Sequence, residues 1–281
     1  MTAPNLCDVD DGLLRSQGKI IHQVWFKLSN KSDELFKKFS AYRDSWIEYN
    51  PDWTYIIWTE NISRNFMYTF YPQFLDMYDS YPYDIQRVDA IRYFALHRYG
   101  GLYADMDSVC FKSLNDMRAN FDQEVYFVES ANKGVGIQIS NSIIYSIPGH
   151  PFWPYLFKGL LKYHKQPPYY PKHMTVMCST GPIFVDRMFC KYKLRFNLDM
   201  LPAPLFNPKG VDSELTGSVQ ELINNGCYMA HFGAGSWESG DSKILIFLYN
   251  NYKMILFIVL CFLPALIVAY MAGKQKQDKK R

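Results

Sequence analysis

The sequence lacks the motifs with which many enzymes bind phosphates, zinc or dinucleotides. No G-x-x-x-x-G-K segment occurs, and the G-x-G pairs at Gly134 and Gly233 have no third glycine, so neither a P-loop nor a dinucleotide fingerprint is present. The six cysteines form no C-x-x-C pair, and Cys261 lies within a long apolar run. These absences give no support to a zinc site or a disulfide framework, and they leave buried thiols as the expectation.

The chain also lacks a strong charge of either sign outside its last residues. Its formal net charge is +3, but residues 274–281 hold five basic side chains against one aspartate, so the preceding residues are nearly neutral. Binding to nucleic acid needs basic side chains gathered on one folded face. We therefore expect no nucleic-acid partner.

A secretory signal is missing as well, whereas a long apolar run is present. The first residues, MTAPNLCDVDDGLLRSQGK, show no basic start followed by an apolar stretch. Met254–Ala272 are nineteen residues without a charge, kinked at Pro264 and followed by a lysine-rich tail. This predicts a single-pass membrane protein of the Golgi or endoplasmic reticulum with a C-terminal anchor. The basic tail and the Asn-x-Ser sites at Asn30 and Asn61 favour a lumenal body, and the missing signal favours a cytosolic one, so the side stays open.

Five segments follow from these observations. We expect a loose leader over residues 1–18, a catalytic α/β domain over 19–243, a juxtamembrane segment over 244–253, a transmembrane helix over 254–272 and a basic tail over 273–281. The sequence shows no internal repeat.

The hydrophobic pattern predicts alternating strands and helices at the start of the catalytic domain. Lys19–Trp25 reads as a buried strand, Asp33–Tyr49 as an amphipathic helix and Trp53–Trp58 as a second strand. Short helices interrupted by Pro72 follow over Asn61–Ser80. This order predicts a parallel sheet with crossover helices, which binds its ligands at the carboxyl ends of its strands.

One further helix and strand lead to such an end. Asp84 can cap a helix that stops at Gly100-Gly101, where a left-handed backbone is readily adopted, and Leu102–Ala104 reads as a strand. Asp105 and Asp107 come next. In an extended chain they point to the same side, while Met106 faces the core.

Two chemistries fit this aspartate pair. Carboxylate oxygens suit Mn²⁺ or Mg²⁺, which keep open positions for water and phosphates. Residues 105–109 also fit the D-x-D-x-[TV] signature of the haloacid dehalogenase-like phosphatases. The pair alone leaves both open.

The longer block YPYDIQRVDAIRYFALHRYGGLYADMDSV, residues 81–109, narrows the choice. It resembles the signature of the DXD-type retaining glycosyltransferases of the inositol phosphoceramide mannosyltransferase kind, glycosyltransferase family 32, kin of the large clostridial glucosylating toxins. The resemblance continues through IIHQVWF, WTYIIWTEN, Asn141 with SIPGHPF, STGP at residues 179–182 and HFGAGSW at residues 231–237. It implies an α/β fold of the GT-A type, a Rossmann-type, mostly parallel sheet with flanking helices, here joined to the C-terminal transmembrane helix.

The resemblance also implies roles for particular residues. The catalytic residues would be Asp89, Arg92, Asp105, Asp107 and Asn141. The donor-binding residues would be His22, Gln23, Trp25, Trp58, Asp89, Arg92, Asp105, Ser179, Gly181, Ser236 and Trp237. The metal ligands would be Asp105, Asp107 and His231, the last in a loop after a strand over Cys227–Ala230.

Ordinary structural interpretations stand beside these roles. Asp89 and Arg92, three residues apart on a helix, could form a surface ion pair of small energetic value. The aromatic residues that end the first two strands could be core, and a lone histidine such as His231 is more often structural than a ligand. Asn141 and residues 179–181 could serve turns only.

The function expected from the resemblance is metal-dependent, retaining transfer of a hexose. Mannose from GDP-mannose is the favoured donor and a UDP-sugar the alternative, and the acceptor would be a lipid headgroup such as inositol phosphoceramide. A glycan chain is the alternative acceptor, and a regulatory membrane subunit is a further partner to consider. A phosphatase and a catalytically silent sugar-binding protein remain as alternatives of other classes.

Overall fold

The computed structural model describes residues 18–27, 32–130, 136–208, 219–233, 238 and 240–251. Its contacts divide the chain into two units, residues 1–170 with 174–237, and residues 171–173 with 238–281. The first unit carries the sheets and the candidate site described below. The predicted segment boundaries at residues 18, 243 and 253 stay predictions.

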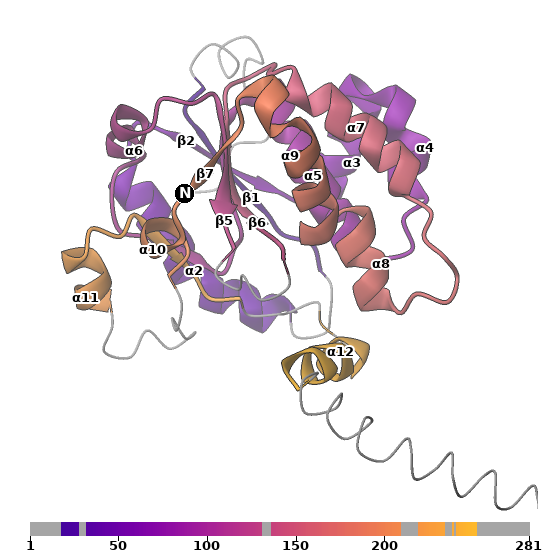
Figure 1. Ribbon diagram of the computed structural model, residues 1–281. Coiled ribbons are helices and arrows are strands. Elements are labelled where there is room, and N and C mark those ends of the chain that lie inside the picture. The colour runs from indigo at the N-terminus through magenta and orange to yellow at the C-terminus, as the bar shows by residue number, and fades with distance from the viewer. Residues whose placement is uncertain are drawn as a thin grey trace, which may run out of the picture. The chain divides into compact units, whose positions relative to one another are not determined.

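A six-stranded sheet forms the centre of the first unit (Figure 1). The strands lie in the order β2 (Thr54–Trp58), β1 (Ile20–Val24), β3 (Gly101–Ala104), β6 (Ile139–Ser146), β5 (Val125–Glu129) and β7 (Asp199–Leu201). Only β6 runs against its neighbours, because the pairs β1–β2, β1–β3 and β5–β7 are parallel. The predicted α/β class and mostly parallel sheet are therefore confirmed.

Helices cover both faces of this sheet (Figure 1). The described helices are α2 (Ser32–Tyr49), α3 (Glu60–Phe70), the 3₁₀ turn η2 (Pro72–Phe74), α4 (Leu75–Asp79), α5 (Asp84–Tyr99), α6 (Leu114–Asn120), α7 (Phe152–Tyr163), α8 (Lys172–Ser179), α9 (Pro182–Phe196), α10 (Ala203–Phe206), α11 (Val219–Asn224) and α12 (Gly240–Asn250). Successive residues of a strand point to opposite faces of the sheet, so each strand contributes side chains to two hydrophobic cores. Ile20 packs with α3, α4, α5, α7 and α9, whereas Ile21 packs with α2, α6 and α10.

Helix α5 is buried on nearly all sides rather than on one face. Its polar residues Gln86, Asp89 and Arg92 are buried together with its apolar ones. Tyr83 is the residue before the helix, and Asp84 is its first helical residue rather than its cap. A buried helix with buried charges is unusual and must pair them internally.

The double glycine after α5 is required by both backbone conformation and space. Gly100 and Gly101 have φ values of 65° and 94°, which side chains other than glycine rarely adopt. A Cβ atom at Gly101 would overlap the carbonyl oxygen of Ile20, because β3 starts beside β1.

We therefore expect Gly101→Ala to lower the free energy of unfolding by about 3 kcal/mol, through a left-handed conformation and a steric overlap. Gly149 is the matched control, since its φ is 70° but a Cβ there would meet nothing within 4 Å. Gly149→Ala should cost only about 1 kcal/mol. Urea denaturation of both variants measures the difference, and equal losses would show that the overlap has no energetic weight.

The described residues include no helix that is both long and apolar enough to span a bilayer; α12 has 11 residues. This finding contradicts the predicted single-pass protein of the Golgi or endoplasmic reticulum with a C-terminal anchor, and we do not retain that localisation. Residues 254–272, on which the prediction rested, lie outside the described residues.

Candidate metal and donor site

Asp105 and Asp107 lie in a tight turn at the carboxyl end of β3. The backbone N–H of Asp105 donates to the Ser142 carbonyl at 2.9 Å, and its own carbonyl accepts the backbone N–H of Ser108 at 3.1 Å. Gln23, near the end of β1, donates its side-chain amide to the same carbonyl at 3.1 Å. The predicted extended geometry is thus wrong. The turn nevertheless brings both carboxylates to one side, and Met106 is buried as predicted.

A small second sheet brings a histidine to this turn. Strand β4 (Ser108–Cys110) pairs antiparallel with β8 (Met229–His231), and the register sets Ser108 opposite His231. The backbone N–H of Phe232 then donates to the Asp107 carbonyl at 3.0 Å. His231 is therefore the last strand residue, and its predicted place in a loop was wrong. The antiparallel register holds its ring over the aspartates.

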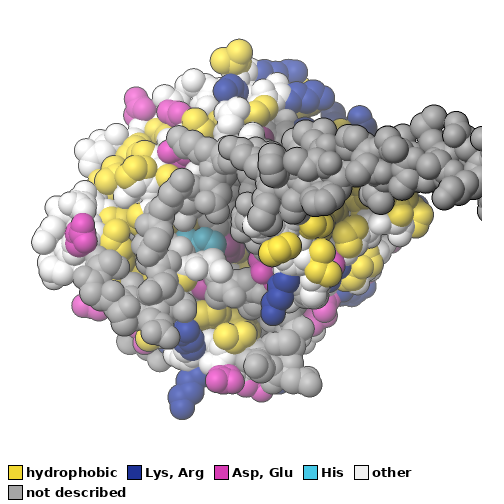
Figure 2. Space-filling view, turned by 60° about the horizontal axis from the view of Figure 1, so that its bottom comes forward, with side chains coloured by type: hydrophobic (Ala, Val, Ile, Leu, Met, Phe, Trp, Pro, Cys, Tyr) yellow, Lys and Arg dark blue, Asp and Glu magenta, His cyan; other side chains and the backbone are white. Residues whose placement is uncertain are grey.

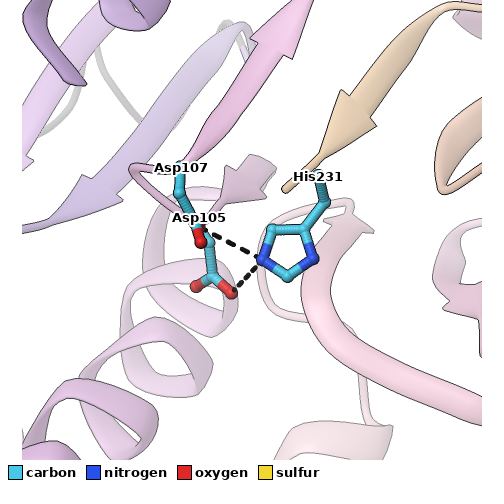
Figure 3. Close-up of side chains that lie close together, drawn as sticks. All are labelled: Asp105, Asp107 and His231. Atoms are coloured by element: carbon cyan, nitrogen blue, oxygen red, sulfur yellow. Dashed lines mark ion pairs between the residues drawn. The ribbon is translucent and has the colours of Figure 1, made fainter. Parts of the chain in front are cut away.

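The three side chains converge on one point (Figure 3). His231 Nε2 lies 3.1 Å from Asp107 Oδ1 and 3.5 Å from Asp105 Oδ2. Ligand atoms of all three residues lie within 4.8 Å of one another. Their side chains are 14–25% exposed, so the cluster is recessed but open to solvent. Figure 2 shows a histidine side chain with acidic side chains beside it.

The electrostatics of this cluster favour a cation. Burial alone would lower the pKa of His231, but the nearby carboxylates of Asp107 and Asp105 outweigh it and raise that pKa to about 9. Without a metal ion, an imidazolium thus supplies the positive charge that the carboxylates require. Two carboxylate oxygens and one imidazole nitrogen form a donor set that Mn²⁺ accepts, with room left for other ligands. The residues therefore fit a divalent cation.

The second oxygen of Asp105 is held from the opposite side. Its Oδ1 accepts the Tyr103 hydroxyl at 2.5 Å and an Arg92 N–H at 3.1 Å. The Arg92 guanidinium also lies 4.3 Å from the centre of the Tyr103 ring. Only Oδ2 therefore faces His231. This arrangement orients the carboxylate so that it can offer one oxygen to a cation.

Asp89 and Arg92 form a buried ion pair rather than a surface one. Their side chains are 2.8 Å apart, and Arg92 also donates to the Asn141 carbonyl at 2.6 Å. Asp89 accepts from Thr180 and from the Asn141 amide, both at 3.0 Å. Burial raises the pKa of Asp89 to about 6, and Arg92 opposes this rise. Arg92 therefore links the buried carboxylate of Asp89 to the metal-side carboxylate of Asp105.

The structure brings Asn141 and the Ser179–Gly181 segment to this pair. Besides Asp89, the Asn141 amide donates to the Tyr93 hydroxyl at 3.1 Å. Ser179 is buried and hydrogen-bonded to Gln86 and Thr175, so its hydroxyl ties α8 to α5. A Cβ on Gly181 would lie 3.5 Å from Asp89 Oδ2. The Ser179–Gly181 segment therefore lies against the Asp89 carboxylate.

His22 and Trp58 lie in the core. The Trp58 indole N–H donates to His22 Nδ1 at 3.1 Å, so Nε2 carries the proton and donates to the Gly100 carbonyl at 2.8 Å. Burial lowers the pKa of His22 to about 4. Both side chains are buried, as the core interpretation expects, and their donor-binding roles stay predictions.

Gln23 and Trp25 lie nearer to the site. The Gln23 side chain accepts the Tyr55 hydroxyl besides holding the Asp105 carbonyl. Trp25 is half-buried at the end of β1 and contacts the rings of Phe36 and Phe39. Their donor-binding roles stay predictions. Ser236 and Trp237, also predicted to bind the donor, lie outside the described residues.

Three site residues were missed by the sequence analysis: Tyr103, Tyr93 and Thr180. Tyr103 lies on β3 two residues before Asp105, and Tyr93 follows Arg92 directly. Thr180 lies inside the STGP segment, between two residues that were predicted. The Tyr93 hydroxyl donates to the Thr180 carbonyl at 2.6 Å. The strand period could have identified Tyr103, whereas the other two depend on contacts between distant segments.

Removal of His231 should weaken metal binding while leaving the fold intact. We expect His231→Ala to raise the dissociation constant for Mn²⁺ by about 10–100-fold, the range that loss of a supporting group in a metal site can cost. Electron paramagnetic resonance of free Mn²⁺ measures this. His164→Ala, at the end of α7, is the matched control. Equal affinities in the two variants would exclude His231 as a ligand.

Comparisons with known proteins agree with this geometry. Residues 37–123 match the family described as the glycosyltransferase sugar-binding region containing the DXD motif. The chain is 32% identical over 264 residues to inositol phosphoceramide mannosyltransferase 2 of Schizosaccharomyces pombe, covering 93% of this chain and 69% of that protein. It is 30% identical to mannosyltransferase 1 of the same yeast, covering 99% of this chain and 81% of the relative. The chain belongs to this glycosyltransferase family.

A third relative is mannosyl phosphorylinositol ceramide synthase CSH1 of Saccharomyces cerevisiae, 34% identical over 83% of this chain and 56% of its own length. Among solved structures, the PaToxG glycosyltransferase aligns with a TM-score of 0.46 at 15% identity, covering 73% of each chain. The family membership decides against the phosphatase alternative.

Proposed function

We propose that this glycosyltransferase transfers mannose from GDP-mannose to the inositol phosphate headgroup of inositol phosphoceramide. The observation that carries the proposal is the convergence of Asp105, Asp107 and His231 at the carboxyl end of β3. The names of the yeast relatives, inositol phosphoceramide mannosyltransferases, support the donor sugar and the acceptor.

Asp105 Oδ2, Asp107 Oδ1 and His231 Nε2 would hold the divalent cation, Mn²⁺ or Mg²⁺. When bound, such a cation supplies positive charge against the negative charge that develops on a departing nucleoside diphosphate. The protein's own contribution is to fix the ligands beforehand. Tyr103 and Arg92 hold one oxygen of Asp105, and β8 holds the imidazole.

Asp89 and Arg92 would position the donor sugar through the network that they share. Arg92 is held in place by Asp89, Asp105 and the Asn141 carbonyl. A sugar that binds beside it would therefore contact a charged side chain that is already ordered. The Asn141 amide is fixed in the same way. A site that is ordered before the substrate binds loses less free energy in ordering side chains.

Front-face attack with retention of the anomeric configuration is the mechanism that these contacts support. A covalent intermediate would need a carboxylate free to attack the sugar. Both Asp89 oxygens accept hydrogen bonds, and that side chain is buried. Asp105 is committed to Tyr103 and Arg92 through Oδ1 and faces His231 through Oδ2. In this proposal the departing phosphate helps to deprotonate the acceptor hydroxyl.

The test is a transfer assay with the purified full chain. GDP-mannose and UDP-sugars are offered as donors with inositol phosphoceramide or a mannosylated glycan as acceptor, each with Mn²⁺ and with a chelator. We expect Mn²⁺-dependent formation of mannosyl-inositol phosphoceramide from GDP-mannose only. Transfer to the glycan alone would change the acceptor, transfer from a UDP-sugar would change the donor, and donor binding without turnover would indicate a silent sugar-binding protein.

A further inference from the structure

Helices α7 and α9 present a basic surface that the nearly neutral net charge of residues 1–273 does not reveal. They pack against each other in antiparallel orientation, because Tyr155 near the start of α7 contacts Arg195 near the end of α9, whereas Tyr163 contacts Arg187. Gly159 permits this close approach, since a Cβ there would lie 2.9 Å from the Met188 side chain. Figure 1 shows the two helices side by side.

This surface, the α7–α9 face, carries an excess of positive charge. Its cations are Lys158, Lys162, Lys165, Arg187, Lys191 and Arg195. The two helices contain one acidic residue, Asp186, whose carboxylate accepts the backbone N–H groups of Gln138 and Ile139. Among the described residues no carboxylate forms an ion pair with any of these six cations. The absence of a basic face, inferred from the net charge, was therefore wrong.

Tyrosines and exposed leucines lie among these cations. Tyr155 lies beneath the guanidinium of Arg195 at 4.6 Å and near the Lys158 ammonium at 5.4 Å. Tyr163 is flanked in the same way by Arg187 and Lys162, which lower its pKa although burial would raise it. Leu194 on α9 is 94% exposed and Leu161 on α7 is 42% exposed.

The helical period places these side chains on one side of each helix. On α7, Leu161 and Lys162 follow Lys158 by three and four residues, and Lys165 lies two residues after the helix ends. On α9, Arg187, Lys191, Leu194 and Arg195 follow the same spacing. Because α7 and α9 pack side by side, the two rows form one surface. A face that carries both cations and projecting apolar side chains suits a bilayer surface, where anionic headgroups cover an apolar interior.

We propose that the α7–α9 face docks peripherally on a lipid bilayer that carries anionic phosphoinositol headgroups. The cations would meet the headgroup phosphates, and Leu194 and Leu161 would enter the interface. The choice of a bilayer over another polyanion rests on the proposed function, whose acceptor is a lipid with an inositol phosphate headgroup. Such docking would hold the protein at the surface that carries its proposed acceptor.

Cys190 offers a probe within this face. Its thiol is exposed on α9 beside Lys191, whereas Cys110, Cys178 and Cys227 are buried. The test measures the rate of maleimide labelling of Cys190 in the full chain by peptide mass spectrometry, with vesicles of phosphatidylcholine alone or with added phosphatidylinositol. We expect phosphatidylinositol to slow labelling by about fivefold or more. About 1 M salt, where the Debye length is about 3 Å, should abolish the effect.

Two double variants test the charge. Lys158→Glu with Lys191→Glu should remove the protection, whereas Lys37→Glu with Lys38→Glu, which changes the net charge equally on the exposed side of α2, should retain it. Mn²⁺-dependent hydrolysis of the donor should be unchanged in both. Equal slowing by phosphatidylcholine alone, no slowing at all, or equal loss in the α2 variant would overturn the proposal.

Two further measurements make the result specific. Equal protection by polyglutamate or RNA would show a general polyanion surface and would overturn the assignment to a bilayer. Asp107→Ala should abolish transfer but keep the protection of Cys190. Failure of the docking and failure of the proposed transferase activity are therefore distinguishable.

Discussion

Asp107→Ala is expected to lower the rate of mannosyl transfer by about 10³-fold or more. The variant removes the carboxylate nearest to His231, 3.1 Å away, and with it one of three ligands. A bound metal ion contributes several kcal/mol to the stabilisation of developing charge. Each factor of ten in rate corresponds to about 1.36 kcal/mol, so loss of this stabilisation should lower the transfer rate by about 10³-fold.

The measurement is the turnover of GDP-mannose with inositol phosphoceramide at saturating Mn²⁺, beside direct Mn²⁺ binding. Asp122→Ala, at an exposed aspartate after α6, is the matched control and should keep full activity. Asp107→Asn keeps the side-chain shape but lacks the charge, and we expect it to lose Mn²⁺ binding as well. Full transfer by Asp107→Asn in the presence of a chelator would refute the metal-dependent account.

Arg92→Ala is expected to lower the free energy of unfolding by about 3–5 kcal/mol. Its guanidinium is buried between Asp89 and Asp105 and also donates to the Asn141 carbonyl. Removal of one partner of a buried ion pair leaves an uncompensated charge, which costs that much in other proteins. Arg92→Lys should not restore stability, because an ammonium cannot donate to three separate acceptors in the plane of a guanidinium.

Urea denaturation measures this loss, with Arg64→Ala as control. Arg64 pairs with Asp79 in an exposed ion pair, whose contribution should stay below about 1 kcal/mol. The combined variant Arg92→Met with Asp89→Asn should lose less than Arg92→Ala, because one of the two unpaired carboxylates is then removed. A loss in Arg92→Ala no larger than that in Arg64→Ala would mean that the buried network does not stabilise the fold.

The features of this protein that could be predicted are those that depend on residues close together in the chain. The strands β1 and β2, the helix α5 and the double glycine could be read because apolar spacing and turn chemistry act within a few residues. The motif around Asp105 and Asp107 indicated the site for the same reason. The proposed role of His231 as a metal ligand could be inferred from the family resemblance alone, because no local sequence pattern marks it as a ligand.

The errors have a common origin in contacts between distant segments. Asp89 and Arg92 have the spacing of a surface pair, yet α5 is enclosed by the sheet and by α7, so the pair is buried. The net charge concealed the α7–α9 face because it sums over the whole chain and ignores position. His22 lies in the middle of β1 and Trp58 ends β2, and their side chains meet each other in the core.

The sequence by itself determined the order of strands and helices as far as β3, the two carboxylates at a strand end and the family, since each depends on residue type and short spacing. Only the tertiary structure decided that β8 sets His231 beside Asp107, and that Arg92 joins two buried carboxylates behind the site. The physical reason is that strand register and helix burial arise from packing between segments far apart in the chain, where no local pattern records which partner will be met.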